Sequence, residues 1–493
     1  MVATKSELIS SVVSGIVGED RIRDDEFTRR IYSHDVAGFP KMMDLMFNWR
    51  PDCVVKPESA EEISKIVKFA NKERIAIVPR GGASWAMTGA VPVEGGIVLD
   101  TTHMNHVLEI DSDNMAVTTE AGITWQDLSD EVDKKGYMVA SYPSSYAAAT
   151  VAGWINTGGK VGVGSYKYGG ICDNIRSLEV VMPNGEILNT GSKNTQSGGT
   201  GYNLNKLFVS AEGTLGIITK VTLKIYPKGE LRPMSYLFSD FRSVCGAIRE
   251  LTRSSVNPYF ISFADDRHFK LLGELGHGDT PDGCMLNVVL EGTKESMDVE
   301  EAIVDEMMKG AKKESPELGE HEWEERAYEC RTRRLGPSSL LAEAFVPVRN
   351  MNGATSDIYE LIRKMKLRGA IVGMVSDRNS VMFMPYCLCD ERKLIRNLMT
   401  LGFMGQVASI GFKNGGRPAG LGVFFSYNLR KLHGGVAYGL MHDIKFSLDP
   451  YDTMNTGKTL EGLTRLGFPL PGAVLPLGMA IMPIVKRIMT ADK

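Results

Sequence analysis

The sequence predicts an α+β protein with more than one domain, and three observations support this prediction. The chain has 493 residues, enough for two or more domains that each bury a substantial core. Residues 50–228 alternate short helical stretches, such as residues 59–71, with β-rich blocks. Residues 229 to about 458 combine a helical pattern at 294–312 with a strand pattern at 285–291.

The chain divides into four regions. Residues 1–49 are expected to form an N-terminal helical segment, and residues 50–228 a first domain. A Pro-Lys-Gly sequence at 227–229 marks the boundary to a second domain, residues 229–458. Residues 459–493 form an apolar tail that contains several prolines.

Composition and charge are those of an ordinary globular protein, with 24% charged and 43% hydrophobic residues. The formal net charge of −4 gives no reason to expect a nucleic-acid partner. The cysteines are scattered, and the spacing of Cys387 and Cys389 suits neither a zinc site nor an iron–sulfur cluster. Scattered thiols and an N-terminus without an apolar signal-peptide core predict a cytoplasmic protein.

A glycine-rich loop at residues 78–90 is the most informative segment of the chain. It follows an apolar, strand-like stretch at 75–78 and contains the adjacent glycines Gly81 and Gly82. Glycines and small residues let a loop turn back and point several backbone N–H groups at one spot, which creates a nest for phosphate oxygens. The loop has neither the Lys-Ser/Thr of a Walker A motif nor a GxGxxG pattern. Taken alone, it is equally consistent with an ordinary strand connection.

Further sequence blocks follow the loop, at residues 96–111, 117–128, 142–169, 173–186 and 207–219. Together with the loop they resemble the FAD-binding domain of the vanillyl-alcohol oxidase / p-cresol methylhydroxylase superfamily. Within it, the chain is most similar to the branch of glycolate oxidase catalytic subunits and FAD-dependent D-lactate dehydrogenases. The resemblance implies a two-subdomain FAD-binding domain of the p-cresol methylhydroxylase type and an α+β cap (substrate) domain. The end of that cap, residues 444–458, is expected to return to the flavin.

The resemblance also implies which residues hold FAD. Residues 80–84 correspond to the pyrophosphate loop, residues 143–144 and 150–158 line the ribityl chain and the ring, and the backbone near 217–218 lies against the flavin. The expected cofactor-binding residues are Arg80, Gly81, Gly82, Ala83, Ser84, Pro143, Ser144, Thr150, Gly153, Asn156, Gly158, Glu212, Gly213, Ile217, Ile218 and Asn455. Relatives that link FAD covalently can carry a histidine just after the glycines. Because this chain has Ala83 there, we expect non-covalent, dissociable FAD.

In the D-lactate, D-2-hydroxyglutarate and glycolate branch, a divalent metal polarises the substrate hydroxyl. Its ligands come from a G-H-x-G-D-G-N-x-H motif and a later E-H-G-x-G motif. In the nearest match to the first motif, Met374 and Val381 replace both histidines, although Asp377 and Asn379 keep their places. The nearest match to the second motif, residues 418–422, has neither Glu nor His. Thioether and alkyl side chains do not ligate a hard divalent ion, so we expect no catalytic metal at this location.

Three arginines are candidates for binding an anionic substrate. Arg326 ends a Trp-Glu-Glu-Arg sequence that resembles the family's W-x-x-R, whose arginine is placed to bind the substrate carboxylate. Arg378 stands where the family has glycine, and Arg417 lies beside the position of the lost Glu-His pair. A guanidinium group makes two parallel hydrogen bonds to a carboxylate. We expect Arg326 to hold the substrate and a second arginine to supply part of the missing metal's charge. For Arg378 and Arg417 an ordinary surface position is the alternative.

A general base is needed for the hydroxyl proton, and the sequence leaves several candidates. These are His433, His442, Tyr386 and Tyr427, and for each of them a structural role is the alternative. The predicted catalytic residues are Arg326, Arg378 and His433.

The sequence thus predicts an FAD-dependent dehydrogenase that oxidises a 2-hydroxy acid, similar to D-lactate or glycolate, or a related anionic alcohol. The resemblance implies hydride transfer to flavin N5. It also implies that the electrons pass to a separate iron–sulfur or electron-transfer subunit, since this chain has no cysteine cluster of its own. The alternative, favoured by the loss of the metal ligands, is a flavin-bearing relay or scaffold subunit of a larger redox complex.

The tail contains a stretch without a single charged residue, residues 466–485. Its length would span a bilayer, but four prolines interrupt it, so a continuous spanning helix is not expected. Three interpretations are compatible with this pattern: a docking surface for a partner subunit, a strap packed on the enzyme itself, and a peripheral membrane contact.

Overall fold

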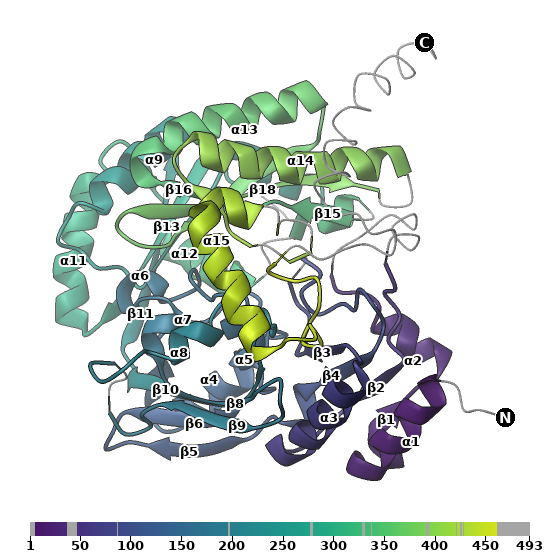
Figure 1. Cartoon of the computed structure of the whole chain (residues 1–493). Coiled ribbons are helices and arrows are strands. Elements are labelled where there is room, and N and C mark those ends of the chain that lie inside the picture. The colour runs from purple at the N-terminus through teal and green to yellow at the C-terminus, as the bar shows by residue number, and fades with distance from the viewer. Residues whose placement is uncertain are drawn as a thin grey trace, which may run out of the picture.

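The computed structural model describes residues 5–36, 47–85, 87–195, 198–276, 280–327, 331–336, 338–390, 394–420, 422–423, 426 and 428–460. Within these residues the chain forms three β-sheets with helices packed around them, which is the predicted α+β arrangement (Figure 1). The predicted tail contact at 466–485 lies outside the described residues.

The first sheet is mostly parallel and uses the N-terminal part of the chain. Its elements are α1 (Lys5–Val17), β1 (Ile22–Arg23), α2 (Glu26–Ile31), β2 (Cys53–Val55), α3 (Ala60–Glu73), β3 (Ile77–Arg80) and β4 (Ile97–Asp100). The strand order is β1-β2-β4-β3, with β4 parallel to both β2 and β3. Ser59 caps α3 by accepting a hydrogen bond from Glu62 N, and Ile63 on its buried face packs in the same core as Ile9 of α1. The N-terminal segment is therefore part of this sheet's subdomain.

The second sheet is antiparallel. Its elements are β5 (Val107–Asp111), β6 (Ala116–Glu120), α4 (Trp125–Asp133), β7 (Tyr137–Val139), α5 (Val151–Asn156), α6 (Ser165–Tyr168), α7 (Ile171–Asn174), β8 (Ile175–Val181), β9 (Ile187–Gly191), α8 (Asn205–Phe208) and β10 (Ile217–Pro227). The strand order is β5-β6-β10-β8-β9, and β7 also pairs with β10. Trp125 of α4 and Ile155 of α5 are fully buried in the core beside β10. The start of β10 is thereby fixed next to α5.

The third sheet belongs to the cap. Its elements are β11 (Glu230–Phe238), α9 (Phe241–Leu251), β12 (Phe260–Ala264), α10 (Asp266–Gly273), β13 (Cys284–Gly292), α11 (Lys294–Met307), β14 (Lys312–Lys313), α12 (Pro316–Glu324), β15 (Ser338–Leu341), β16 (Ala344–Pro347), α13 (Met351–Met365), β17 (Gly369–Val375), β18 (Ser380–Cys389), α14 (Leu394–Lys413) and β19 (Arg417–Pro418). The strand order is β14-β11-β13-β12-β17-β18-β16-β19, with β15 on β18. Helices α9, α11, α13 and α14 lie along the outside of the cap (Figure 1).

The helical pattern at 294–312 is divided between two elements. Helix α11 ends at Met307, and Lys312 pairs with Leu237 as the edge strand β14. Gly310, a poor helix former, lies between these two elements, so the helix does not continue to the edge of the sheet.

The last described part of the chain returns from the cap to the first sheet. Helix α15 (Asn428–Leu448), interrupted at Gly434 with φ of 79°, runs from the cap down to the level of α5 (Figure 1). Near its end, Lys445 Nζ donates hydrogen bonds to Asp449 Oδ2 (2.5 Å) and to the carbonyl oxygen of Met454 (3.0 Å). Ile77 N then donates to the carbonyl oxygen of Thr453 (2.7 Å). The closing segment thus extends the sheet along β3.

Candidate active site

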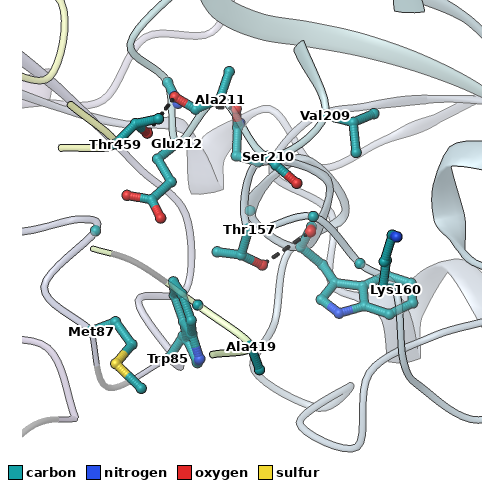
Figure 2. A pocket seen from close by; sticks show the side chains of 18 of the residues that line it. Trp85, Met87, Thr157, Lys160, Val209, Ser210, Ala211, Glu212, Ala419 and Thr459 are labelled. Atoms are coloured by element: carbon teal, nitrogen blue, oxygen red, sulfur yellow. Dashed lines mark hydrogen bonds between the residues drawn. The ribbon is translucent and has the colours of Figure 1, made fainter. Parts of the chain in front are cut away.

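A cavity of about 920 Å³ is lined by residues of all three sheets and of α15. Figure 2 shows part of its lining from close by. Its volume is near the upper end of the range of ligand-binding pockets, as expected for a site that takes a long cofactor together with a substrate. All the predicted cofactor-binding residues except Asn455 line it. Residues far apart in the sequence therefore meet at one site, as the resemblance implied.

The glycine-rich loop leaves β3 and lies tightly against the segment that begins α5. A Cβ atom at Gly82 would overlap the carbonyl oxygen of Ala148, and one at Gly81 would overlap Thr150 Oγ1. Only glycine permits this approach, which places the loop beside the first turn of α5. Ala83 adopts the left-handed conformation with φ of 48°, so the chain turns back directly after the two glycines.

Arg80 connects the two ends of this loop. Its guanidinium carbon lies 4.9 Å from the centre of the Tyr32 ring, and Nη1 donates to the carbonyl oxygen of Ala90 (3.2 Å). The Tyr32 hydroxyl in turn donates to Asp100 Oδ2 (2.5 Å). Burial lowers the pKa of Arg80, and the nearby Tyr32 and Asp100 oppose that effect. The arginine is therefore held in place by the protein itself.

Two side chains deep in the site carry buried polar atoms that make no hydrogen bond within the described residues. They are Glu212 Oε2 and Asn455 Oδ1. Glu212 is 8% exposed and points into the cavity (Figure 2), and its Oε1 accepts a hydrogen bond from Gly422 N (3.0 Å). Burial raises the pKa of Glu212 to about 7, against the effects of that hydrogen bond and of the Lys458 charge. Asn455 Nδ2 donates to the Glu212 carbonyl oxygen (2.5 Å), so the two residues form one unit.

Lys458 is a buried cation that the sequence did not identify. It is 2% exposed, and Nζ donates to the carbonyl oxygen of Val91 (2.8 Å). Burial lowers the pKa of Lys458 to about 8, and the charge of Glu212 opposes that effect. The hydrogen bond from Lys458 holds the closing segment against the residue that follows the glycine-rich loop, Val91. In the sequence, Lys458 is marked only by its place directly after Thr456-Gly457 and before the apolar tail.

The cap sheet supplies the opposite wall of the cavity. Strand pairing places Met374 of β17 beside Met382 of β18, and Met382 beside Phe345 of β16. Phe345 is in turn paired with Arg417 of β19. These four side chains line the cavity, so a row of three apolar groups ends in one guanidinium. The guanidinium carbon lies 4.2 Å from the centre of the Phe345 ring, and burial lowers the pKa of Arg417.

Glu343 lies in the neighbouring row on the same wall. The pairing of Ala344 with Phe383 places Glu343 opposite Met384, and the Glu343 carbonyl oxygen accepts a hydrogen bond from Ala419 N (3.3 Å). Burial raises the pKa of the Glu343 carboxyl to about 7, and a hydrogen bond from the Trp85 side chain limits the increase. Glu343 is not among the residues predicted from the sequence. The signal was a single acidic residue in an otherwise apolar stretch, Leu-Leu-Ala-Glu-Ala-Phe-Val.

Arg326 lies just behind the cavity wall. It belongs to a short 3-10 helix, Glu325–Ala327, of which Ala327 lines the cavity and Arg326 does not. Its guanidinium carbon is 3.9 Å from the centre of the Trp323 ring, and Nη2 donates to the Tyr142 hydroxyl (3.2 Å). Its Nε is buried and makes no hydrogen bond within the described residues.

Arg378 differs from the expectation. It lies on the turn between β17 and β18, outside the cavity, and donates hydrogen bonds to the carbonyl oxygens of Thr252, Ser254 and Val256. These hydrogen bonds hold the loop after α9 in place. Of the two arginines near the lost metal motifs, Arg417 is the one that lines the cavity, because it pairs with Phe345 of β16, which also lines it.

The residues that keep the metal motif's places have structural roles. Asp377 Oδ1 accepts hydrogen bonds from Asn379 N (2.7 Å) and Ser380 N (2.9 Å), which closes the turn between β17 and β18. Val381 is fully buried. Among the described residues, no group of three or more His, Cys, Asp or Glu side chains could hold a metal ion.

The base candidates are dispersed. His433 lines the cavity, beside the interruption of α15 at Gly434. His442 packs its ring on Phe446, with 4.4 Å between the ring centres. Tyr386 is buried outside the cavity, where its hydroxyl lies 2.9 Å from His268 Nδ1. Tyr427 lies outside the described residues.

Two family models match the chain: an FAD binding domain over residues 51–191 and the C-terminal domain of FAD linked oxidases over residues 231–459. The chain belongs to the FAD-linked oxidases. This FAD-linked oxidase is similar to glycolate oxidase subunit GlcD of Bacillus subtilis, with 29% identity over 76% of this chain and 80% of the relative. It is also similar to a probable mitochondrial D-lactate dehydrogenase of Danio rerio, with 29% identity over 83% of this chain and 84% of the relative.

Solved structures agree with this assignment at the level of the fold. The FAD-linked oxidase superposes on p-cresol methylhydroxylase with substrate bound with a TM-score of 0.80. The match covers 93% of this chain and 98% of that one, at 20% identity. The predicted p-cresol methylhydroxylase-type fold is confirmed, and so is the prediction of an FAD-dependent oxidoreductase.

FAD is the cofactor of this FAD-linked oxidase, and the cavity suits it. The glycine loop and the first turn of α5 form a narrow cradle, and Glu212 Oε2 on the cavity wall is a buried oxygen that makes no hydrogen bond within the described residues. Ile217 and Ile218, at the start of β10, supply an apolar wall. The predicted cofactor-binding residues other than Asn455 line this cavity, and Asn455 contacts Glu212, so the assignment of these residues to FAD stays a prediction.

Proposed function

We propose that the protein is a dehydrogenase that oxidises the hydroxyl-bearing carbon of a 2-hydroxy acid or a related anionic alcohol. The proposal rests on one observation: a cationic side chain, Arg417, and an acidic one, Glu343, both line the cavity on the cap wall. The names of the relatives, glycolate oxidase subunit GlcD and D-lactate dehydrogenase, support the same substrate class.

In this mechanism the protein holds the two ends of the reacting group. Arg417 binds the substrate carboxylate through two parallel hydrogen bonds, which a guanidinium provides better than an ammonium. Arg326, from the W-x-x-R sequence, is the second candidate for this role and lies behind the adjacent wall. When bound, FAD supplies the acceptor for the hydride that leaves the substrate carbon.

Glu343 receives the hydroxyl proton at its carboxylate. A general base works best when its pKa lies near the working pH, and the pKa of Glu343 is about 7. The bond from Trp85 fixes the orientation of the carboxyl group. His433 also lines the cavity and is the alternative base. The products are a 2-oxo acid and the reduced cofactor, with the proton left on the protein.

The experiment that tests this function uses the chain purified without added flavin. Its visible spectrum is recorded under anaerobic conditions while glycolate, each enantiomer of lactate and longer 2-hydroxy acids are added. We expect the flavin absorbance to bleach with at least one of them. A flavin that responds to dithionite but to none of these acids would contradict the proposal. That result would favour a relay or scaffold subunit. The replacement of the metal-ligating histidines by Met374 and Val381 supports the same alternative.

We further propose a separate acceptor for the electrons, an iron–sulfur or electron-transfer subunit, because the described cysteines form neither disulfides nor a metal-binding cluster. The lack of disulfides among the described cysteines supports a cytoplasmic location. Among the described helices, none has both the length and the apolar character needed to cross a membrane.

A further inference from the structure

We propose that the substrate carries a long or bulky apolar chain, which lies on a methionine floor formed by Met374, Met382 and Met384. This inference rests on the proposed function and names the substrate class more closely: an amphipathic 2-hydroxy acid.

The floor is one face of the cap sheet. Along β18, alternate residues point to opposite sides, so Val381 and Phe383 pack among the residues beneath the outer helices. Met382 and Met384 face the other way and line the cavity. Met374, paired with Met382, extends the same surface onto β17. The three thioethers therefore form one continuous apolar patch.

Polar groups on this wall are confined to one edge. Arg417 stands at the β19 end of the row, and Glu343 directly precedes β16 in the neighbouring row. A carboxylate bound to Arg417 therefore anchors a substrate at the edge, and the rest of the molecule meets Phe345, Met382 and Met374 in turn. Three strand spacings separate β19 from β17, which makes the row about 14 Å long. A two- or three-carbon acid reaches only its beginning.

The chemistry of the floor suits a variable apolar chain. Methionine side chains are flexible and polarisable, and they adapt to ligands of irregular shape. Met374 also stands where the resemblance places a metal-ligating histidine. The same replacement thus removes a metal ligand and completes the floor. Each methylene transferred from water onto such a surface strengthens binding about fourfold.

Two series of compounds test the inference on the FAD-loaded enzyme. The first compares kcat/KM for 2-hydroxy acids from glycolate to 2-hydroxyoctanoate, together with 3-phenyllactate. The second measures the Kd of unreactive straight-chain carboxylates, acetate to octanoate, by isothermal titration calorimetry. We expect kcat/KM to rise and Kd to fall by about fourfold per methylene until the floor is covered. The calorimetric series does not depend on turnover.

A matched pair of variants places the chain on the floor. Met382→Gln keeps the length and volume of the side chain but turns an amide toward the ligand, so the slope of affinity against chain length should flatten. Met382→Leu keeps the surface apolar and should retain the slope. The flavin absorbance of both variants shows that they are folded and loaded.

The outcomes separate this inference from the proposed function. Bleaching by glycolate and lactate, with no gain for longer acids and a flat calorimetric series, would overturn the apolar-chain inference and leave the proposed function standing. If no 2-hydroxy acid bleached the flavin, the proposed function would be overturned. The carboxylate series would then still show whether the methionine floor binds an apolar chain. A steep slope that survives in Met382→Gln would place the chain elsewhere and refute the floor.

Discussion

Replacing Glu343 by glutamine tests the candidate base through two properties at once. Glutamine keeps the shape of the side chain and an oxygen that can accept the hydrogen bond from Trp85, but it cannot take up a proton. We expect kcat/KM to fall by about 10²- to 10⁴-fold, the usual contribution of a positioned base. The wild-type enzyme should gain activity as pH rises through about 7, when Glu343 becomes ionised, and the variant should lose that dependence.

The same substitution should make the protein more stable at high pH. Burial raises the pKa of Glu343 from 4.5 to about 7, so between these values the folded protein binds more protons than the unfolded chain. The free energy of unfolding of the wild type therefore falls as pH rises through this window. At 1.36 kcal/mol per pH unit, the penalty above pH 7 reaches at most about 3 kcal/mol. Glu343→Gln removes it.

Two measurements check these expectations. Chemical denaturation of both proteins at pH 5 and pH 8 should show a difference that grows with pH in favour of the variant. The pH profile of kcat/KM, taken at equal flavin content, should be flat near 7 for the variant. An active variant with an unchanged profile would refute the assignment of Glu343 as the base. A stability difference that is equal at both pH values would refute burial of its charge as the cause.

Further predictions concern the arginines, the glycine loop and the cofactor bond. Arg417→Met should lower kcat/KM by about 10²- to 10³-fold, mainly through KM, with flavin content retained, because the substrate carboxylate loses its partner. Arg378→Met is the matched control: KM should stay unchanged while the free energy of unfolding falls by about 1 kcal/mol, and a large rise in KM would return Arg378 to the site. Gly82→Ala should abolish the flavin absorbance, because its Cβ would overlap the Ala148 carbonyl, whereas Gly246→Ala on α9, with open space around it, should keep the flavin. Acid denaturation should release all of the FAD, since Ala83 offers no side chain for a covalent bond, and flavin left on the precipitated protein would contradict this.

The cofactor-binding part of the site could be predicted because short sequence motifs mark it. The adjacent glycines Gly81 and Gly82 indicate that another part of the backbone comes close to the loop. In the structure this is the segment that leads into α5. The resemblance carried by the ordered blocks after the loop then implied which residues meet around one ligand. Asn455 was the one predicted contact that reaches the site through Glu212 rather than lining the cavity.

The substrate half could not be predicted, because it depends on strand register between distant segments. Arg378 lies within the first lost metal motif and Arg417 beside the second, and only strand pairing decides that Arg417 stands beside Phe345. Glu343 carries no motif at all, and its role follows from a neighbour, Trp85, that lies far away along the chain. Met374 could be recognised as a lost ligand but not as part of an apolar surface.

The return of residues 453–455 to β3 affects how the protein acquires its cofactor during synthesis. Ile77 emerges early from the ribosome, whereas Thr453 and Asn455, which extend the sheet beside it, emerge only after the whole cap has been made. The nucleotide-binding subdomain therefore remains incomplete throughout translation of the second domain. We therefore expect flavin to be loaded late, and a chain that ends before residue 453 to lack this part of the cofactor site.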